Sequence, residues 1–226
     1  MGIKIYNRDI LIETAILFSL FYLPSYLFQS TIGDPSAFND PVFNIQLWVV
    51  YIPQIALILY IIYKNPKKSF ADFGICRIKT GEIPYILLTA AGLVSIVAVI
   101  QLLLFLLPSS ALMENMFTWE FSNKNVIPLV LLSSLLTGYS EELFFRSYLF
   151  TRFEELGLGK MHIILTINVL FALGHFYEGY EGGLNALILG FYFSVVFLWK
   201  RNIHIPAIVH GLYNFSALMI SFYTHS

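Results

Sequence analysis

Long apolar runs separated by short polar stretches repeat along the 226 residues of the chain. Runs of about 17–25 apolar residues are long enough to cross ~30 Å of hydrocarbon as α-helices. They predict spans near residues 9–29, 45–63, 84–106, 127–150, 162–178, 183–199 and 205–223. Residues 108–122, which mix apolar and acidic side chains, could add an interfacial helix. The pattern therefore predicts an all-α, polytopic transmembrane helical bundle with about seven to eight spans.

The amino-acid composition is typical of a membrane protein and limits the classes of partner that the chain is expected to bind. The chain is 58% hydrophobic and 12% charged, about half the charged share of a typical soluble domain. The length suits a single membrane domain over residues 1–226. No basic cluster of the kind that binds nucleic acid occurs, so we expect membrane lipids and no nucleic acid among the partners. The single cysteine, Cys76, excludes an internal disulfide.

Basic residues gather on alternate connections between the predicted spans. One side of the membrane would carry Lys4, Arg8, Lys64, Lys67, Lys68, Arg77, Lys79, Arg146, Arg152, Lys160, Lys200 and Arg201. The other side would carry Lys124, together with Asp34, Asp40, Glu114, Glu120, Glu178 and Glu181. Because cytoplasmic loops are enriched in Lys and Arg, we predict a cytoplasmic N-terminus and a C-terminus outside. Arg146 is weak evidence for the orientation, since it lies inside a predicted span.

Three charges lie close together within the apolar run that begins near Ile127. The stretch EELFFR places Glu141, Glu142 and Arg146 inside a predicted membrane helix, where a charge costs at least a few kcal/mol. Glu142 and Arg146 are four residues apart and share one helix face. We predict that they form an ion pair. Glu141 lies about 100° around the helix, which leaves it freer to act as a general base.

Two further motifs use the same spacing in later spans. FALGH places Phe171 four residues before His175, and HGLYN places His210 four residues before Asn214. Polar groups in lipid tend to face one another, so one shared interior site is the economical arrangement. The alternative is structural, because a Glu–Arg pair can fix helix packing, and single histidines and asparagines commonly link membrane helices.

The motifs EExxxR, FxxxH and HxxxN, in this order on successive membrane helices, resemble those of the CAAX protease and bacteriocin-processing family. This family includes the type II prenyl-protein endopeptidases. The resemblance covers residues 127–215, which we take as the predicted catalytic core. Each motif alone is a weak signal, whereas all three in order are specific.

The resemblance implies an intramembrane endopeptidase that cuts with a glutamate-activated water. Glu141 would be the general base, assisted by His175. His210 and Asn214 would stabilise the oxyanion. The paired carboxylate and arginine of the first motif would support the site.

The resemblance leaves the use of a metal open. The usual helix-borne zinc signature, HExxH, does not occur in the chain. We expect a mechanism without a cofactor. The alternative is a zinc ion held by Glu141, His175 and His210, with water as the fourth ligand.

The expected substrate is a membrane-associated peptide or protein. A prenylated C-terminal peptide and a leader peptide both fit. A composition rich in Ile, Phe, Tyr, Asn and Lys points to a prokaryotic plasma membrane, where the chain would be an integral multi-pass protein. The rival function is a non-enzymatic membrane adaptor or immunity protein that retains the protease fold.

The predicted span limits conflict with one shared site. On those limits Glu141 and His210 lie roughly 8–9 Å from the cytoplasmic edge, and His175 lies about 20 Å from it. The three can meet only if the fifth span is tilted, re-entrant or begins later. We expect the limits of that span to be wrong and the motif to be right.

Overall fold

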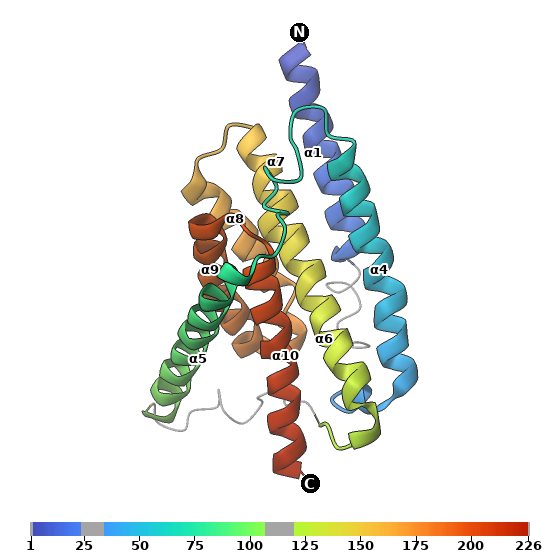
Figure 1. Ribbon diagram of the computed structural model, residues 1–226, viewed down its shortest axis with the longest axis vertical. Coiled ribbons are helices and arrows are strands. Elements are labelled where there is room, and N and C mark those ends of the chain that lie inside the picture. Colours follow the sequence, from blue (N-terminus) through green and yellow to red (C-terminus); the bar gives the residue numbers. More distant parts are fainter. Residues whose placement is uncertain (1, 24–33, 107–119, 226) are drawn as a thin grey trace.

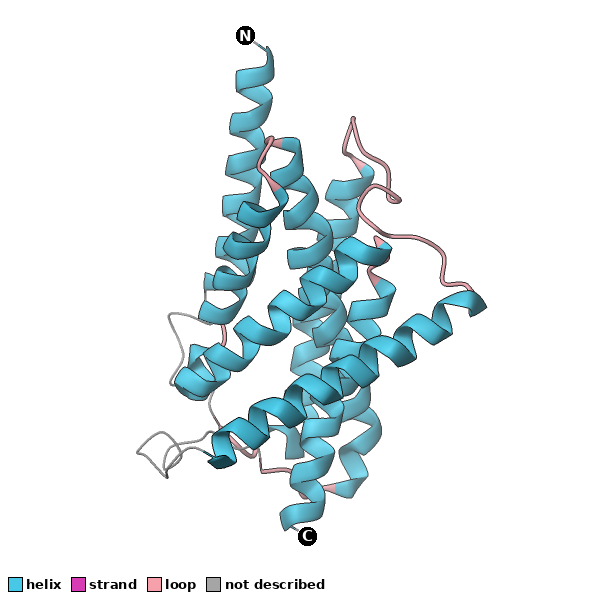
Figure 2. Cartoon of the chain, turned by 90° about the vertical axis from the view of Figure 1, so that its left-hand side faces the viewer, coloured by secondary structure: helices cyan, strands magenta, loops and turns pink. Residues whose placement is uncertain are grey.

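The structure, a computed structural model, describes residues 2–23, 34–106 and 120–225. Within these ranges the chain forms helices and loops and no strand (Figure 2), which confirms the predicted helical membrane bundle. The predicted interfacial helix at 108–122 lies almost entirely outside the described residues, as does the second part of the predicted span 9–29.

The helices follow one another with short connections. They are α1 (Gly2–Phe21), α4 (Pro41–Tyr63), α5 (Ile83–Leu106), α6 (Ile127–Glu142), α7 (Phe150–Glu155), α8 (Lys160–Leu173), α9 (Gly179–Lys200) and α10 (His204–His225). Short 3₁₀ turns include Ala37–Asn39, Thr80–Glu82, Lys124–Val126 and Phe176–Glu178. Five of the described helical stretches are long and apolar enough to cross a membrane, which supports an integral membrane protein.

The fourth predicted span is longer than expected and changes its winding. α6 passes directly into a π-helix, Leu143–Leu149, which passes into α7 and ends at Glu155. The prediction ended this span at residue 150 because TRFEE is polar. The helix continues because Arg152 pairs with Glu155 at 2.6 Å and with Glu13 of α1 at 2.7 Å. Both contacts offset the cost of the charges.

The fifth predicted span, 162–178, is wrong. α8 ends at Leu173 and has 14 residues, which span about 21 Å and do not cross ~30 Å of hydrocarbon. The glycine-rich sequence that follows explains the end: Gly174 caps the helix, and Gly179 turns the chain into α9 with φ 84°, a conformation that glycine adopts at low cost. His175 therefore lies in a turn and not on a membrane helix.

Close packing of α6 against α10 brings two of the three motifs together. A Cβ added at Gly138 would lie 2.6 Å from the backbone N of Gly211, and one added at Gly211 would lie 2.8 Å from the Cα of Leu135. Small residues that let two backbones approach are the usual means of helix association in lipid. The contact sets the first and third motifs on facing helices, with α1 and α4 on one side of α6 and α5 on the other (Figure 1).

With the observed helix limits, Glu141 and His175 lie at similar depths, so the conflict between the predicted spans and one shared site disappears. Glu141 precedes the end of its helix at Glu155 by about 21 Å of helical rise, and His175 follows the start of α8 at Lys160 by a similar length of chain. α10 begins within the protein, because Asn202 and Ile203 just before it are buried. The conflict in depth arose mainly because the prediction ended the fourth span at residue 150, whereas the helix ends at Glu155.

Candidate active site

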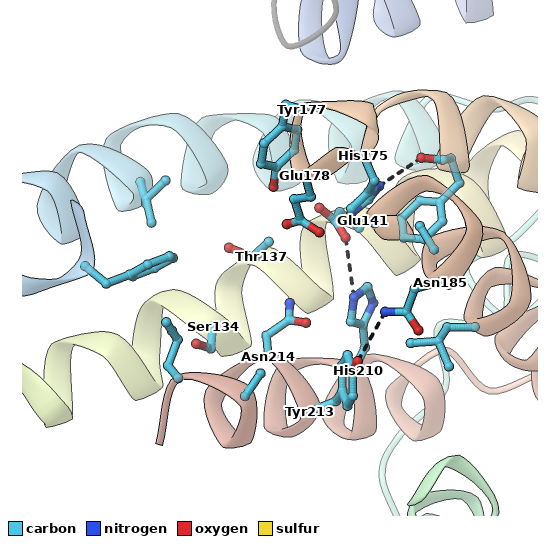
Figure 3. A pocket seen from close by; sticks show the side chains of 18 of the residues that line it. Ser134, Thr137, Glu141, His175, Tyr177, Glu178, Asn185, His210, Tyr213 and Asn214 are labelled. Atoms are coloured by element: carbon cyan, nitrogen blue, oxygen red, sulfur yellow. Dashed lines mark hydrogen bonds and ion pairs between the residues drawn. The ribbon is translucent and has the colours of Figure 1, made fainter. Parts of the chain in front are cut away.

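A cavity of about 320 Å³ lies inside the bundle and is lined by the residues that the three motifs single out (Figure 3). Glu141 comes from α6, His175 from the turn after α8, and His210 and Asn214 from α10. Apolar side chains from α4, α9 and α10 complete much of the wall. The structure therefore brings together all four residues that were predicted to do chemistry.

The predicted Glu142–Arg146 ion pair forms beneath the cavity. Both side chains are fully buried, and Nη1 of Arg146 donates to Oε1 of Glu142 at 2.9 Å. Arg146 lies within the π-helix, a winding that is often found at functional sites. Pairing is what makes two charges tolerable in this apolar setting.

Arg146 is held from several other directions. Its Nη2 donates to Oδ1 of Asn168 at 3.3 Å and to the carbonyl of Gly190 at 3.2 Å. Its guanidinium carbon lies 4.5 Å from the ring centroid of Phe171, a cation–π distance. Asn168 of α8 also donates to Ser194 of α9 at 3.0 Å. The arginine thus ties the first motif to α8 and α9.

His210 links the buried ion pair to the cavity. Its Nδ1 lies 2.9 Å from the same Glu142 oxygen that accepts from Arg146. A carboxylate only accepts hydrogen bonds, so Nδ1 carries a proton. The ring is stacked on Phe193 with a centroid distance of 5.1 Å. These contacts fix the ring so that Nε2 points to Glu141, 3.5 Å from its Oε2.

Glu141 presents a carboxylate oxygen to the cavity. The side chain is 12% exposed, and within the described part of the chain its Oε2 accepts no hydrogen bond. The neighbouring carboxylate of Glu142 is neutralised by Arg146, whereas the nearest cationic partner of Glu141 is the imidazole of His210 at 3.5 Å. The two adjacent glutamates therefore have different surroundings.

His175 faces the same cavity with a defined tautomer. Its Nδ1 lies 2.9 Å from the carbonyl oxygen of Phe171, which can only accept, so this nitrogen donates. Nε2 is then free to accept a hydrogen bond. The ring lies against Phe171, with centroids 4.5 Å apart, so the first residue of FxxxH orients the last.

Several cavity residues were not predicted as part of the site. They are Tyr51, Ser134, Thr137, Tyr177, Glu178, Asn185 and Tyr213, among others. Asn185 of α9 donates to the hydroxyl of Tyr213 of α10 at 3.3 Å. Glu178 was placed outside the membrane by its charge. Its position three residues after His175, next to a glycine-rich turn, was the signal that could have identified it.

The donor set does not form a metal site in this structure. Among the described residues no three His, Cys, Asp or Glu side chains are grouped so that they could hold one ion. His175 and His210 each donate one ring nitrogen to a protein oxygen, an arrangement that is also common in metal-bound histidines. The three ligands of the zinc alternative line one cavity, but they are not grouped around one point.

The fold and the cavity define a class: a helical integral membrane protein with a carboxylate–histidine site inside the bundle. Residues 123–216 match the family described as Type II CAAX prenyl endopeptidase Rce1-like. The match contains all three motifs, confirms the resemblance to CAAX proteases, and supports a protease. No curated protein and no solved structure gives a match to the chain.

Proposed function

We propose that the chain is an intramembrane endopeptidase that hydrolyses a peptide bond of a membrane-associated peptide or protein with a water activated by Glu141. The observation that carries the proposal is Oε2 of Glu141, which accepts no hydrogen bond within the described residues, lies 3.5 Å from Nε2 of His210, and lines a cavity beside His175, His210 and Asn214. A non-enzymatic adaptor would have no use for an unpaired carboxylate in this position, and the family match does not favour it.

The hydrolysis follows from the positions of these groups. A water that donates one hydrogen bond to Glu141 and another to Nε2 of His175 is held for attack on a substrate carbonyl. Glu141 takes the proton as the oxygen–carbon bond forms, and the carbonyl oxygen becomes an oxyanion. Glu141 then returns the proton to the leaving nitrogen as the carbon–nitrogen bond breaks.

Donors for the oxyanion come from α10. Asn214 contributes its side-chain amide, and His210 contributes Nε2 when the ring is protonated. A protonated His210 would balance the charge of two carboxylates and one arginine. Such fixed donors typically contribute 10²–10³-fold to the rate each. Glu142 and Arg146 act on the reaction through His210 and do not touch the substrate.

The substrate class follows from the place of the cavity. Because the cavity lies between apolar helices, a peptide that is already attached to the membrane can reach it without crossing water. A prenylated C-terminal peptide and a leader peptide both fit this description.

Replacement of the base tests the proposal. We expect Glu141→Gln to reduce cleavage by at least about 10³-fold, since the amide cannot take a proton, while thermal unfolding in detergent stays within ~1 °C of the wild type. Comparative peptidomics of membranes that contain either protein would identify the substrate. Glu120→Gln, the same change at an exposed site, is the control. Wild-type cleavage products in the Glu141→Gln membranes would refute the mechanism.

The proposed mechanism also makes a prediction about metals. We expect the purified protein to contain less than one equivalent of zinc, and a chelator to leave cleavage unchanged, because no ligand set is assembled around a metal ion. Elemental analysis and activity after dialysis against a chelator check this. Loss of activity on dialysis and its return on addition of zinc would favour the alternative.

A further inference from the structure

A second chamber of about 190 Å³ adjoins the catalytic cavity. It lies between α5, the first turns of α9, and α10, and it is lined by Val97, Ile100, Gln101, Glu178, Glu181, Gly182, Leu184, Asn185, Ile188 and Tyr213. Four of these residues, Glu178, Gly182, Asn185 and Tyr213, also line the catalytic cavity. The two spaces therefore share a wall.

An interhelical hydrogen bond lies on that wall. Nδ2 of Asn185 donates to the hydroxyl of Tyr213 at 3.3 Å, at the long end of the range for hydrogen bonds. Figure 3 shows this pair beside His210, with the Glu178 carboxylate in the catalytic cavity. A substrate side chain on a residue near the scissile bond could thus enter the second chamber.

The chamber combines apolar walls with an unpaired carboxylate. Val97 and Ile100 of α5 face Leu184 and Ile188 of α9 across it. Both carboxylate oxygens of Glu181 are buried, and neither has a hydrogen-bond partner in the described ranges. A buried carboxylate without a partner is costly, and a cation bound in the chamber would offset that cost.

The walls of the two spaces are rich in carboxylates. They contain Glu141, Glu178 and Glu181 and, among the described residues, neither a lysine nor an arginine, and the two histidines belong to the catalytic cavity alone. An apolar or acidic side chain in the chamber would leave Glu181 unpaired. A lysine or arginine side chain suits both the apolar walls and the carboxylate of Glu181, because its methylene stem contacts apolar groups and its head is positively charged.

We infer that the chamber is a specificity site that binds the side chain of a basic residue of the substrate, with the ammonium or guanidinium group at Glu181 and the stem between α5 and α9. Glu178, on the shared wall, lies between this cation and the reacting bond. The inference rests on the proposed peptidase function for its biological meaning, but the binding itself does not require catalysis.

Binding of a lysine side-chain analogue tests the chamber directly. In thermal unfolding of the full chain in detergent, n-butylammonium should raise Tm in proportion to its occupancy, and 1-butanol at the same concentration should not. Glu181→Gln should weaken the apparent affinity for n-butylammonium by at least about tenfold, as expected for the loss of a buried charge pair. Glu120→Gln, at an exposed site, should leave it unchanged.

A second variant tests the chamber without changing a carboxylate, so the result does not depend on how well Glu181→Gln folds. Ile188→Trp keeps both carboxylates and fills the chamber from its apolar wall, so it should also abolish the effect of n-butylammonium. An equal effect of 1-butanol, no effect of the amine on the wild type, or an unchanged effect in Glu181→Gln would each overturn the inference.

Cleavage of paired peptides separates this inference from the proposed function. Two peptides that differ only by Lys or Gln near the scissile bond should differ in kcat/KM by at least about tenfold in the wild type, and Glu181→Gln should reduce that ratio towards one. If neither peptide is cut while n-butylammonium still binds through Glu181, the peptidase proposal fails and the chamber stands. If both are cut equally by the wild type, the chamber does not select substrates.

Discussion

Glu142 accepts two hydrogen bonds through one oxygen, from Arg146 and from His210, both at 2.9 Å. This oxygen connects the buried ion pair to the imidazole that faces Glu141. The first motif therefore has two carboxylates with different surroundings, although they are adjacent in sequence and identical in chemistry. The difference comes from which helix face each one occupies.

A double-mutant cycle should show that Glu142 and Arg146 act as a unit. Glu142→Gln leaves a buried guanidinium without its counter-ion and should cost about 3–5 kcal/mol of unfolding free energy. Arg146→Met should cost a similar amount. The double variant should cost clearly less than the sum of the two, because neither charge remains. Unfolding in detergent measures all three.

The control for this cycle is an exposed ion pair. Arg8 and Asp9 lie 3.7 Å apart with both side chains more than half exposed, so Arg8→Met should change stability by less than about 1 kcal/mol. Additive costs for Glu142→Gln and Arg146→Met would mean that the pair is not coupled.

At this scale the sequence predicted much of the site because lipid penalises unpaired polar groups. That argument placed Glu141, His175, His210 and Asn214 together, and the cavity contains them all. It could not find the partner of Glu13. Glu13 has no basic neighbour on its own helix turn, and its partner Arg152 is 139 residues away.

Among the elements, the π-helix and the α8–α9 turn decide how the site is assembled. A π-helix has no sequence signature comparable to a capping residue, so its presence at Leu143–Leu149 could not be predicted. The early end of α8 could have been predicted from the four glycines between residues 174 and 183. Hydropathy alone extended the span through them.

Two glycines with positive φ allow a test of the turn that holds His175. Gly179 and Gly157 have φ of 84° and 81°, and a Cβ at either would meet open space. Replacement of each by alanine should cost about 1–3 kcal/mol of stability, because a residue with a side chain is strained at positive φ. Only Gly179→Ala should also reduce kcat, because it lies in the turn that positions His175.

Unfolding and cleavage measured on the same preparations separate these two effects. Equal losses of kcat in Gly179→Ala and Gly157→Ala would show that general destabilisation, and not the position of His175, limits the reaction.

For the whole molecule, the distribution of basic residues predicts which end of the bundle faces the cytoplasm. The connection between α7 and α8 lies towards the end that carries the N-terminus, and the connection between α4 and α5 begins at that end (Figure 1). The α4–α5 connection contains Lys64, Lys67, Lys68, Arg77 and Lys79, and Arg152 and Lys160 flank the α7–α8 connection. Since cytoplasmic loops are enriched in such residues, we expect this end to face the cytoplasm.

The single cysteine of the chain makes this orientation measurable. Cys76 is exposed in the loop between α4 and α5, so a membrane-impermeant maleimide should label it in inverted vesicles and not in right-side-out vesicles. The variant Cys76→Ser with Asn125→Cys moves the thiol to an exposed position at the start of α6, at the opposite end of the bundle, and should reverse the result. Labelling of Cys76 in right-side-out vesicles would place the basic loops outside and would overturn the charge-based orientation, while the intramembrane site would remain as described.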